Sequence, residues 1–164
     1  MIRICALLGV TLVLNGFAIA QTPQATQTPR AYGPSVNVAS AKKVAAVAIG
    51  EAQNNHWYMA VAVVDTSGTL IYYEKMDNTQ TGSANVAIEK ARTSALYKRP
   101  TKAFQDLVAG GGSGLRILGL PGAVPIEGGV PLISDDKVVG AVGVSGGSSD
   151  QDGQCAQAAA DSLK

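Results

Sequence analysis

A run of alternating small and branched residues near the end of the chain most constrains what it can fold into. Residues 130–133 and 138–144 are apolar, and the tetrad Ser-Asp-Asp-Lys between them predicts a β-hairpin with a short turn. The period of two in the second run places these residues on one face or the other: Val138, Gly140, Val142 and Val144 on the first, and Val139, Ala141 and Gly143 on the second. A strand with so little bulk can take a close neighbour, such as a packed helix or another subunit. We therefore expect the rest of the chain to pack against this hairpin.

The first twenty residues have the pattern of a secretory signal peptide. Arg3 precedes an apolar stretch over residues 4–17, and Ala-Ile-Ala at 18–20 is a typical cleavage site. The stretch is short for a bilayer span, which favours cleavage over a retained membrane anchor. Residues 21–36, rich in Gln, Thr and Pro, are expected to form a disordered linker. The chain is thus predicted to be exported, periplasmic or extracellular, with one folded domain over residues 37–164.

The net charge and the number of cysteines further limit the class of protein to which the chain can belong. Without the leader, 12 basic side chains (13 less Arg3) balance 12 acidic ones. A near-neutral chain with no basic stripe argues against a nucleic-acid partner. Cys155 then remains as a lone cysteine, so no internal disulfide is expected, and its alanine neighbours predict a buried helix position.

The coarse order of elements is helix, two strands, two helices, an irregular segment, two or three strands, and a final helix. Residues 59–64 and 69–75 are expected to form a second hairpin, and residues 115–120 a short strand. Four helix starts are indicated by capping patterns: Asn37, Ser83, Thr101 and Ser149-x-x-Asp152. This order predicts an α+β domain, an antiparallel sheet with helices packed on its faces.

Several motifs in sequence order resemble the GlcG/HbpS family of haem-binding and haem-degrading proteins, a domain also found at the C-terminus of PduO-type corrinoid adenosyltransferases. The resemblance covers residues 37–164. The motifs are AVVDxxG at 62–68, AIxKARTSAL at 87–96, RPTKAF at 99–104, PGAVPIxGGVP at 121–131 and VGAVGVSG at 139–146.

The resemblance implies a profilin-like sandwich that assembles as a homo-oligomer, often of six or eight copies. It implies haem as the cofactor of some members. For exported members it implies slow oxidative haem breakdown or redox signalling to a sensor partner. The glycine-rich stretch at residues 110–114 departs from the common pattern, so the surface there is expected to differ.

His56 is the first candidate site residue. Haem iron is usually held by His, Met, Cys or Tyr, and His56 is the single histidine of the sequence. It precedes the first expected strand, beside Trp57 and Tyr58, which could cover a porphyrin face. The alternative is an exposed loop histidine without a ligand.

Other candidates lie on the second and third expected helices. The resemblance implies a threonine contact to haem in an exported relative, for which Thr93 and Thr101 are candidates; for Thr101 a helix cap is the alternative. Tyr97, with Lys98, offers a phenol and a cation for a haem propionate. Lys90 and Arg92 could each bind a carboxylate, or be solvated surface residues.

Two functions stay open. The first is an exported haem-binding protein that uses an apolar contact and one weak axial ligand. The second is a non-catalytic oligomeric module for a small organic acid or a partner protein, using Arg92 or the hydroxyls and amides of residues 145–149. The sequence has no P-loop, dinucleotide fingerprint, zinc-type Cys/His cluster or nucleophile elbow, which disfavours nucleotide hydrolysis and triad hydrolases.

Overall fold

The computed structural model describes residues 29–163, so the predicted signal peptide and the first part of the predicted linker lie outside the described residues. Along the chain the elements are α1 (Val38–Asn54), β1 (Ala60–Val64), β2 (Leu70–Lys75), α2 (Ser83–Tyr97), α3 (Thr101–Ala109), the 3₁₀ helix η1 (Gly112–Gly119), β3 (Gly129–Ser134), β4 (Lys137–Ser145) and α4 (Ser149–Asp161). Between residues 29 and 163, no helix has both the length and the apolar character that a bilayer crossing requires.

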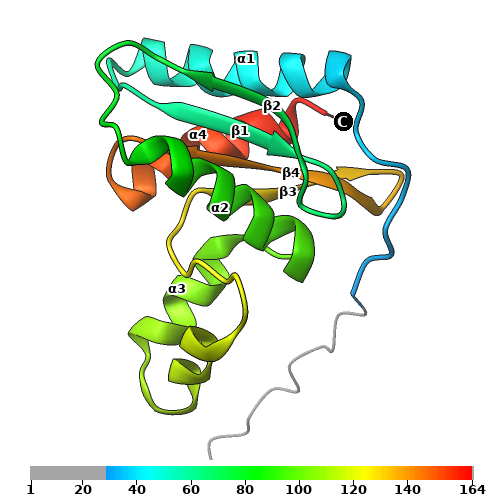
Figure 1. Ribbon diagram of the computed structural model, residues 1–164, viewed down its shortest axis with the longest axis vertical. Coiled ribbons are helices and arrows are strands. Elements are labelled where there is room, and N and C mark those ends of the chain that lie inside the picture. Colours follow the sequence, from blue (N-terminus) through cyan, green and yellow to red (C-terminus); the bar gives the residue numbers. More distant parts are fainter. Residues whose placement is uncertain (1–28, 164) are drawn as a thin grey trace, which may run out of the picture.

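The four strands form one antiparallel sheet in the order β2-β1-β4-β3 (Figure 1). β1 is buried along its whole length and pairs with β2 on one side and β4 on the other. β1 of the first hairpin therefore pairs with β4 of the second hairpin, and this pairing joins the two hairpins into one sheet. The predicted α+β class and both predicted hairpins are confirmed.

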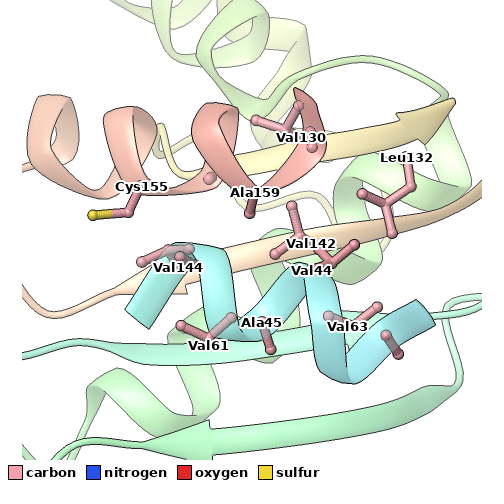
Figure 2. Close-up of a cluster of buried hydrophobic side chains, with 14 of the residues drawn as sticks. Val44, Ala45, Val61, Val63, Val130, Leu132, Val142, Val144, Cys155 and Ala159 are labelled. Carbon is pink, nitrogen blue, oxygen red and sulfur yellow. The ribbon is translucent and has the colours of Figure 1, made fainter. Parts of the chain in front are cut away.

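α1 and α4 cover one face of the sheet and enclose the larger core. Figure 2 shows Val44 and Ala45 of α1 and Ala159 of α4 gathered with valines of the sheet. Fully burying a side chain of this size contributes about 1.5–3 kcal/mol, so this layer is a main source of stability. Cys155 belongs to the same cluster and is fully buried, as its alanine neighbours predicted.

α2 alone covers the opposite face, and it lies unusually close to the sheet. Its buried alanines, Ala87, Ala91 and Ala95, pack against Ala62 and Ala141. At Gly143 a Cβ atom would stand only 2.1 Å from the Ala87 carbonyl oxygen. The glycine and alanine alternation in β4 therefore serves the close approach of a helix.

The β3–β4 hairpin contains one irregularity that the alternation did not reveal. Its turn residues Asp135 and Asp136 both have positive φ (49° and 56°), as a two-residue hairpin turn requires. The strand register shifts between Leu132 and Ile133, which pair with Gly140 and Val138, so Val139 of β4 is the extra residue of a β-bulge. It turns Val139 to the α1–α4 face, so the prediction that Val139 shares a face with Ala141 was wrong.

Part of the predicted linker is ordered. The Val36 amide donates to the Val139 carbonyl (2.7 Å), and the Gly33 amide donates to Val138 (2.9 Å). Val36 is also buried in the larger core. Residues 31–36 thus run beside β4, because these amides find carbonyl partners there, and the ordered domain extends N-terminal of residue 37.

The segment predicted as a short strand at residues 115–120 is instead part of η1. Gly111 and Gly112 have positive φ (66° and 53°) and turn the chain back onto α3. Gly114 then packs directly against the Leu107 carbonyl, where a Cβ would lie at 1.9 Å. Residues 115–119 therefore pack on α3 and do not join the sheet. In Figure 1, α3 and η1 project away from the sheet.

Capping was predicted correctly for α1 only. Asn37 accepts a hydrogen bond from the Ser40 amide. α2 has no side-chain cap, and Ser83, expected as its cap, has a buried hydroxyl without a hydrogen-bond partner. In α4 the capping box joins Ser148 and Gln151, one residue before the predicted pair.

Candidate functional site

His56 stands on the surface directly after α1. The chain leaves this helix through Asn55, and His56 takes a left-handed backbone conformation with φ of 58°. His56 is exposed and Tyr58 is 54% exposed, whereas Trp57 is half-buried against the larger core. The Tyr58 carbonyl lies over Gly146, where a Cβ would come within 2.1 Å. An imidazole and a phenol are therefore accessible beside the loop that follows β4.

Other side chains able to hold haem iron are mostly engaged inside the domain. Met59 is fully buried, and its amide donates to the Met76 sulfur at 3.4 Å. Burial, assisted by the nearby Glu51 and Asp152 charges, raises the pKa of the Cys155 thiol to about 12, so this thiol is neutral at physiological pH. His56 and Tyr58 are thus exposed side chains of types that fit haem iron; Tyr32 is also exposed, but its hydroxyl donates to the Ala95 and Leu96 carbonyls.

Lys90 is buried, with 1% of its surface exposed, so the expectation of a solvated lysine was wrong. Its ammonium donates to Asp152 of α4 (2.7 Å) and to the Val144 carbonyl (3.2 Å). It passes under Gly128, where a Cβ would be 2.9 Å from the Lys90 Nζ atom. Lys90 does bind a carboxylate, but one within the protein, and this links α2 on one face of the sheet to α4 on the other.

Asp152 receives two donors in this arrangement. Its second carboxylate oxygen accepts from the Gly147 amide at 3.0 Å. Burial raises the pKa of Asp152, while the Lys90 ammonium and the Gly147 amide act in the opposite direction. A buried charge pair with its remaining lone pairs satisfied is strongly coupled, and loss of one partner leaves the other buried alone.

Arg92 is half-buried and braces the β1–β2 turn. Its guanidinium donates to the Gly68 carbonyl (3.2 Å) and to the Glu89 carboxylate one turn earlier. Both contacts are internal to the described domain. A carboxylate ligand at Arg92 would have to compete with Glu89.

Thr93 and Tyr97 hold the segment that precedes β3. Thr93 donates to the Gly122 carbonyl (3.0 Å) and accepts from the Val124 amide (2.9 Å). The Tyr97 hydroxyl donates to the Pro121 carbonyl at 2.7 Å. Both side chains thus fasten residues 121–124 onto α2.

Thr101 has a related role at the start of β3. Its hydroxyl accepts from the Gly129 amide (2.9 Å) and is fully buried, so it does not cap α3, whose N-cap is Pro100. Lys98 follows α2 with φ of 55° and places its ammonium over the Tyr32 ring, 4.1 Å from the centroid. The structure therefore brings Lys90, Thr93, Tyr97 and Thr101 together around residues 121–129, with Lys90 also bonded to Val144 near the C-terminal end of β4. His56 lies on a separate segment, the connection from α1 to β1.

The turn at residues 145–149, considered for an anion, already uses donors internally. The Gly147 amide donates to Asp152, and the Ser148 amide donates to the Gln151 side chain (3.0 Å). The Ser148 hydroxyl in turn accepts from the Gln151 amide. The two amides at the start of this helix are therefore committed to the cap.

A cavity of about 580 Å³ was missed by sequence reasoning. It lies between α3 and α4, over a floor formed by residues 128–130, and Lys102, Glu127 and Asp150 line it. The sequence does hold one signal for it: Gly153 sits inside a helix, where glycine is unfavourable unless space is needed. Within residues 29–163 no group of three or more His, Cys, Asp or Glu side chains is arranged to hold a metal ion.

Together, the fold and these contacts define a small α+β domain that offers an exposed imidazole and, between α3 and α4, a solvent-open cavity. The chain matches the family of HbpS-like haem degrading proteins over residues 36–161, and it belongs to that family. The predicted resemblance is thereby confirmed.

Individual relatives agree with this assignment. Protein GlcG of Escherichia coli is 40% identical over 95 residues, 58% of this chain and 69% of the relative. The corrinoid adenosyltransferase PduO of Salmonella typhimurium is 32% identical over 114 residues, 68% of this chain but 34% of that protein.

Solved structures share the fold. A doubly substituted HbpS of Streptomyces reticuli aligns with a TM-score of 0.74 and 25% identity, covering 96% of this chain and 99% of that one. A structure described as a PduOC:heme complex aligns with a TM-score of 0.71 and 28% identity, covering 79% and 96%. Haem binding is thus shown for a relative of this chain.

Proposed function

We propose that this chain is an exported haem-binding protein that supports slow oxidative haem breakdown or a haem- or redox-sensing role toward a sensor partner. The observation that carries the proposal is membership of the HbpS-like family, together with the likeness to a relative solved with haem. Export is supported by the pattern of residues 1–20.

The axial ligand in this proposal is His56. Among residue types that hold haem iron, it combines exposure with a position beside the exposed Tyr58 and the half-buried Trp57. His56 lies in the turn that follows α1. In the described part of the chain, its imidazole ring makes no hydrogen bond to a carboxylate or a carbonyl. His56 would hold haem through a single side chain, so the attachment would be weak.

In this proposal, the other predicted site residues hold the backbone in position and do not contact the iron. Lys90, Thr93 and Thr101 are buried, and their polar atoms are bonded within the domain. Tyr97 and Arg92 are similarly engaged, although both retain some exposure. When haem is bound, it would supply the reactivity toward peroxide; Thr93, Tyr97 and Thr101 hold the backbone of residues 121–129 in place.

A fluorescence titration tests the proposal. Trp57 is the single tryptophan of the sequence, and a bound haem quenches tryptophan emission, so added haemin should quench it saturably. We expect His56→Ala to weaken haemin binding about tenfold or more, a change of about 1.4 kcal/mol. Asn54→Ala, two residues earlier and also exposed, is the matched control. Quenching that does not saturate would contradict haem binding. An affinity of the His56 variant equal to that of the unsubstituted protein would contradict the role of His56 as the ligand.

Assembly into a homo-oligomer is part of the same proposal. The projection made by α3 and η1 exposes three leucines: Leu107 (43%), Leu115 (49%) and Leu118 (64%). Neighbouring exposed apolar side chains of this kind are typical of surfaces covered by another chain. The resemblance implied such an assembly independently.

A further inference from the structure

The buried Lys90–Asp152 pair lies at the end of β4, where the chain turns into α4. The Lys90 ammonium donates to the Val144 carbonyl of β4 (3.2 Å) and to the Asp152 carboxylate of α4 (2.7 Å). Gly128 covers the ammonium, since a Cβ at that position would lie 2.9 Å from the Nζ atom. With side chains 1% and 4% exposed, the pair is closed to solvent and to ligands, so any role it has must act through its neighbours.

Asp152 extends this contact into the loop between β4 and α4. Its Oδ2 atom accepts from Lys90, and its Oδ1 atom accepts from the Gly147 amide (3.0 Å). A hydrogen bond to an ionised acceptor is about twice as strong as one between neutral groups. Because Lys90 holds the carboxylate from the other side, the loop is bonded to an acceptor whose orientation is fixed.

The same loop lies against the segment that connects α1 to β1. A Cβ at Gly146 would stand 2.1 Å from the Tyr58 carbonyl oxygen and 2.9 Å from the Met59 Cα atom. The contact continues into the sheet, where Ala60 of β1 is paired with Ser145 of β4. The loop and this segment therefore meet backbone to backbone, so a shift of the loop moves the segment.

His56 lies between two anchors of that segment. Toward α1, the His56 amide donates to the Gln53 carbonyl (3.1 Å), and the Trp57 amide donates to the Ala52 carbonyl (2.9 Å). Toward β1, the anchor is the loop that Asp152 holds. The first anchor consists of backbone groups, whereas the second depends on a side chain that is distant in sequence. The direction of the imidazole therefore depends in part on Asp152.

We propose that Asp152, fixed by Lys90, is a positioning residue for His56. It acts through the Gly147 amide and the Tyr58 backbone, and it touches neither haem nor iron. When the acceptor at position 152 is lost, the loop is released, the imidazole takes up a wider range of orientations, and haem affinity falls. The effect on haem rests on the proposed function, whereas the effect on the orientation of His56 does not.

Two double variants that differ in one acceptor test the proposal. Lys90→Met with Asp152→Asn removes both charges and keeps an oxygen for the Gly147 amide. Lys90→Met with Asp152→Leu removes both charges and that oxygen as well. Neither double variant leaves a buried charge alone, so both should fold. Leu132→Ala, a fully buried position on β3, is the control for a loss of stability without a change at the loop.

Nuclear magnetic resonance of the imidazole gives the first readout. His56 is the single histidine of the sequence, so its ring contributes one Cε1–H signal. We expect this signal to shift or broaden in the Asp152→Leu double variant. It should match the unsubstituted protein closely in the Asp152→Asn double variant and in Leu132→Ala. A signal that is unchanged in the Asp152→Leu double variant, or displaced equally in all three variants, would overturn the proposal.

Haemin affinity, followed by quenching of Trp57 emission, gives the second readout. It should weaken about tenfold in the Asp152→Leu double variant and stay near the unsubstituted value in the other two variants. Equal affinities of the two double variants would overturn the role of Asp152 in haem binding. An unsubstituted protein that does not bind haemin would contradict the proposed function alone, and the imidazole signal would still decide the positioning.

Hydrogen exchange in the unsubstituted protein tests the loop contact without any substitution. The Gly147 amide should exchange slowly because its acceptor is buried, whereas the amide of the exposed Asp77 should exchange fast. Equally fast exchange at Gly147 would overturn the proposal, even if a double variant did not fold.

Discussion

At the scale of single residues, the buried Lys90–Asp152 pair is the most consequential contact. It joins helices that lie on opposite faces of the sheet, and both side chains are almost fully removed from solvent (1% and 4% exposed). The pair passes the end of β4, where Gly128 leaves space for the ammonium. Removal of either charge therefore leaves its partner without compensation in a region of low dielectric.

A double-mutant cycle measures this coupling. Lys90→Met and Asp152→Asn should each lower the free energy of unfolding by about 3–5 kcal/mol. The double variant should lose less than the sum by more than about 1 kcal/mol, because neither charge is then left alone. Urea unfolding of the four proteins provides the values. The exposed pair Lys102–Asp106 is the control and should show a much smaller coupling, and additive losses at Lys90 and Asp152 would contradict the assignment.

Cys155 gives a pH prediction at the same scale. Its pKa is raised to about 12 by burial and by the Glu51 and Asp152 charges, against an ordinary value of 9.0. The thiol should therefore resist a disulfide reagent at pH 8 until the protein unfolds. Because the unfolded thiol ionises first, stability should fall as the pH rises from about 9 toward 12. Cys155→Ser should flatten that slope; rapid labelling of the folded thiol contradicts the argument.

At the scale of elements, the contact between α2 and the sheet depends on glycine and alanine. A Cβ at Gly143 would meet the Ala87 carbonyl oxygen at 2.1 Å and the Ala91 amide nitrogen at 2.5 Å, both backbone atoms that cannot move independently. The helix therefore has to shift away from β4 if this position gains a methyl group. The same shift would disturb Lys90, which lies on that helix.

Two glycine substitutions test this contact. Gly143→Ala should lower the free energy of unfolding by about 1–3 kcal/mol or more, through overpacking. Gly50→Ala, in α1 with no atom within 4 Å of the new Cβ, should raise it by about 0.5–1 kcal/mol. Thermal unfolding of both variants gives the comparison, and a neutral Gly143 substitution would show that the helix is not held as described.

Sequence patterns predicted the elements better than their contacts. Alternation and small-residue stripes are local, so both hairpins and the positions of α1, α2 and α4 could be predicted. The bulge that turns Val139, the packing of residues 115–119 on α3, and the burial of Lys90 depend on partners distant in sequence. Charge alone suggested a solvated lysine; only the fold places Asp152 beside it.

At the scale of the whole molecule, the domain has two layers of helix on one sheet and a projection that the sheet does not cover. α1 and α4 close one face, α2 closes the other, and α3 with η1 extends away from both (Figure 1). The exposed leucines are on this projection, and the cavity between α3 and α4 lies at its base. His56 and this cavity therefore belong to different elements.

The exposed leucines on α3 and η1 allow the proposed homo-oligomer to be tested. Leu118→Glu places a charge where a second copy would pack, so it should shift the sedimentation velocity profile toward smaller species. Lys42→Glu, an exposed charge change on α1, is the control. A monomeric unsubstituted protein at all concentrations would contradict the proposed oligomer, while leaving haem binding to be judged separately.

Haem ligation by His56 is the central claim, and absorption spectroscopy of the haemin complex tests it most directly. The protein should shift the Soret band of haemin with a saturable endpoint, and His56→Ala should lose that shift or give a spectrum of different ligation. A Soret band that does not move on adding the protein, or one identical in the His56 variant, would contradict the claim.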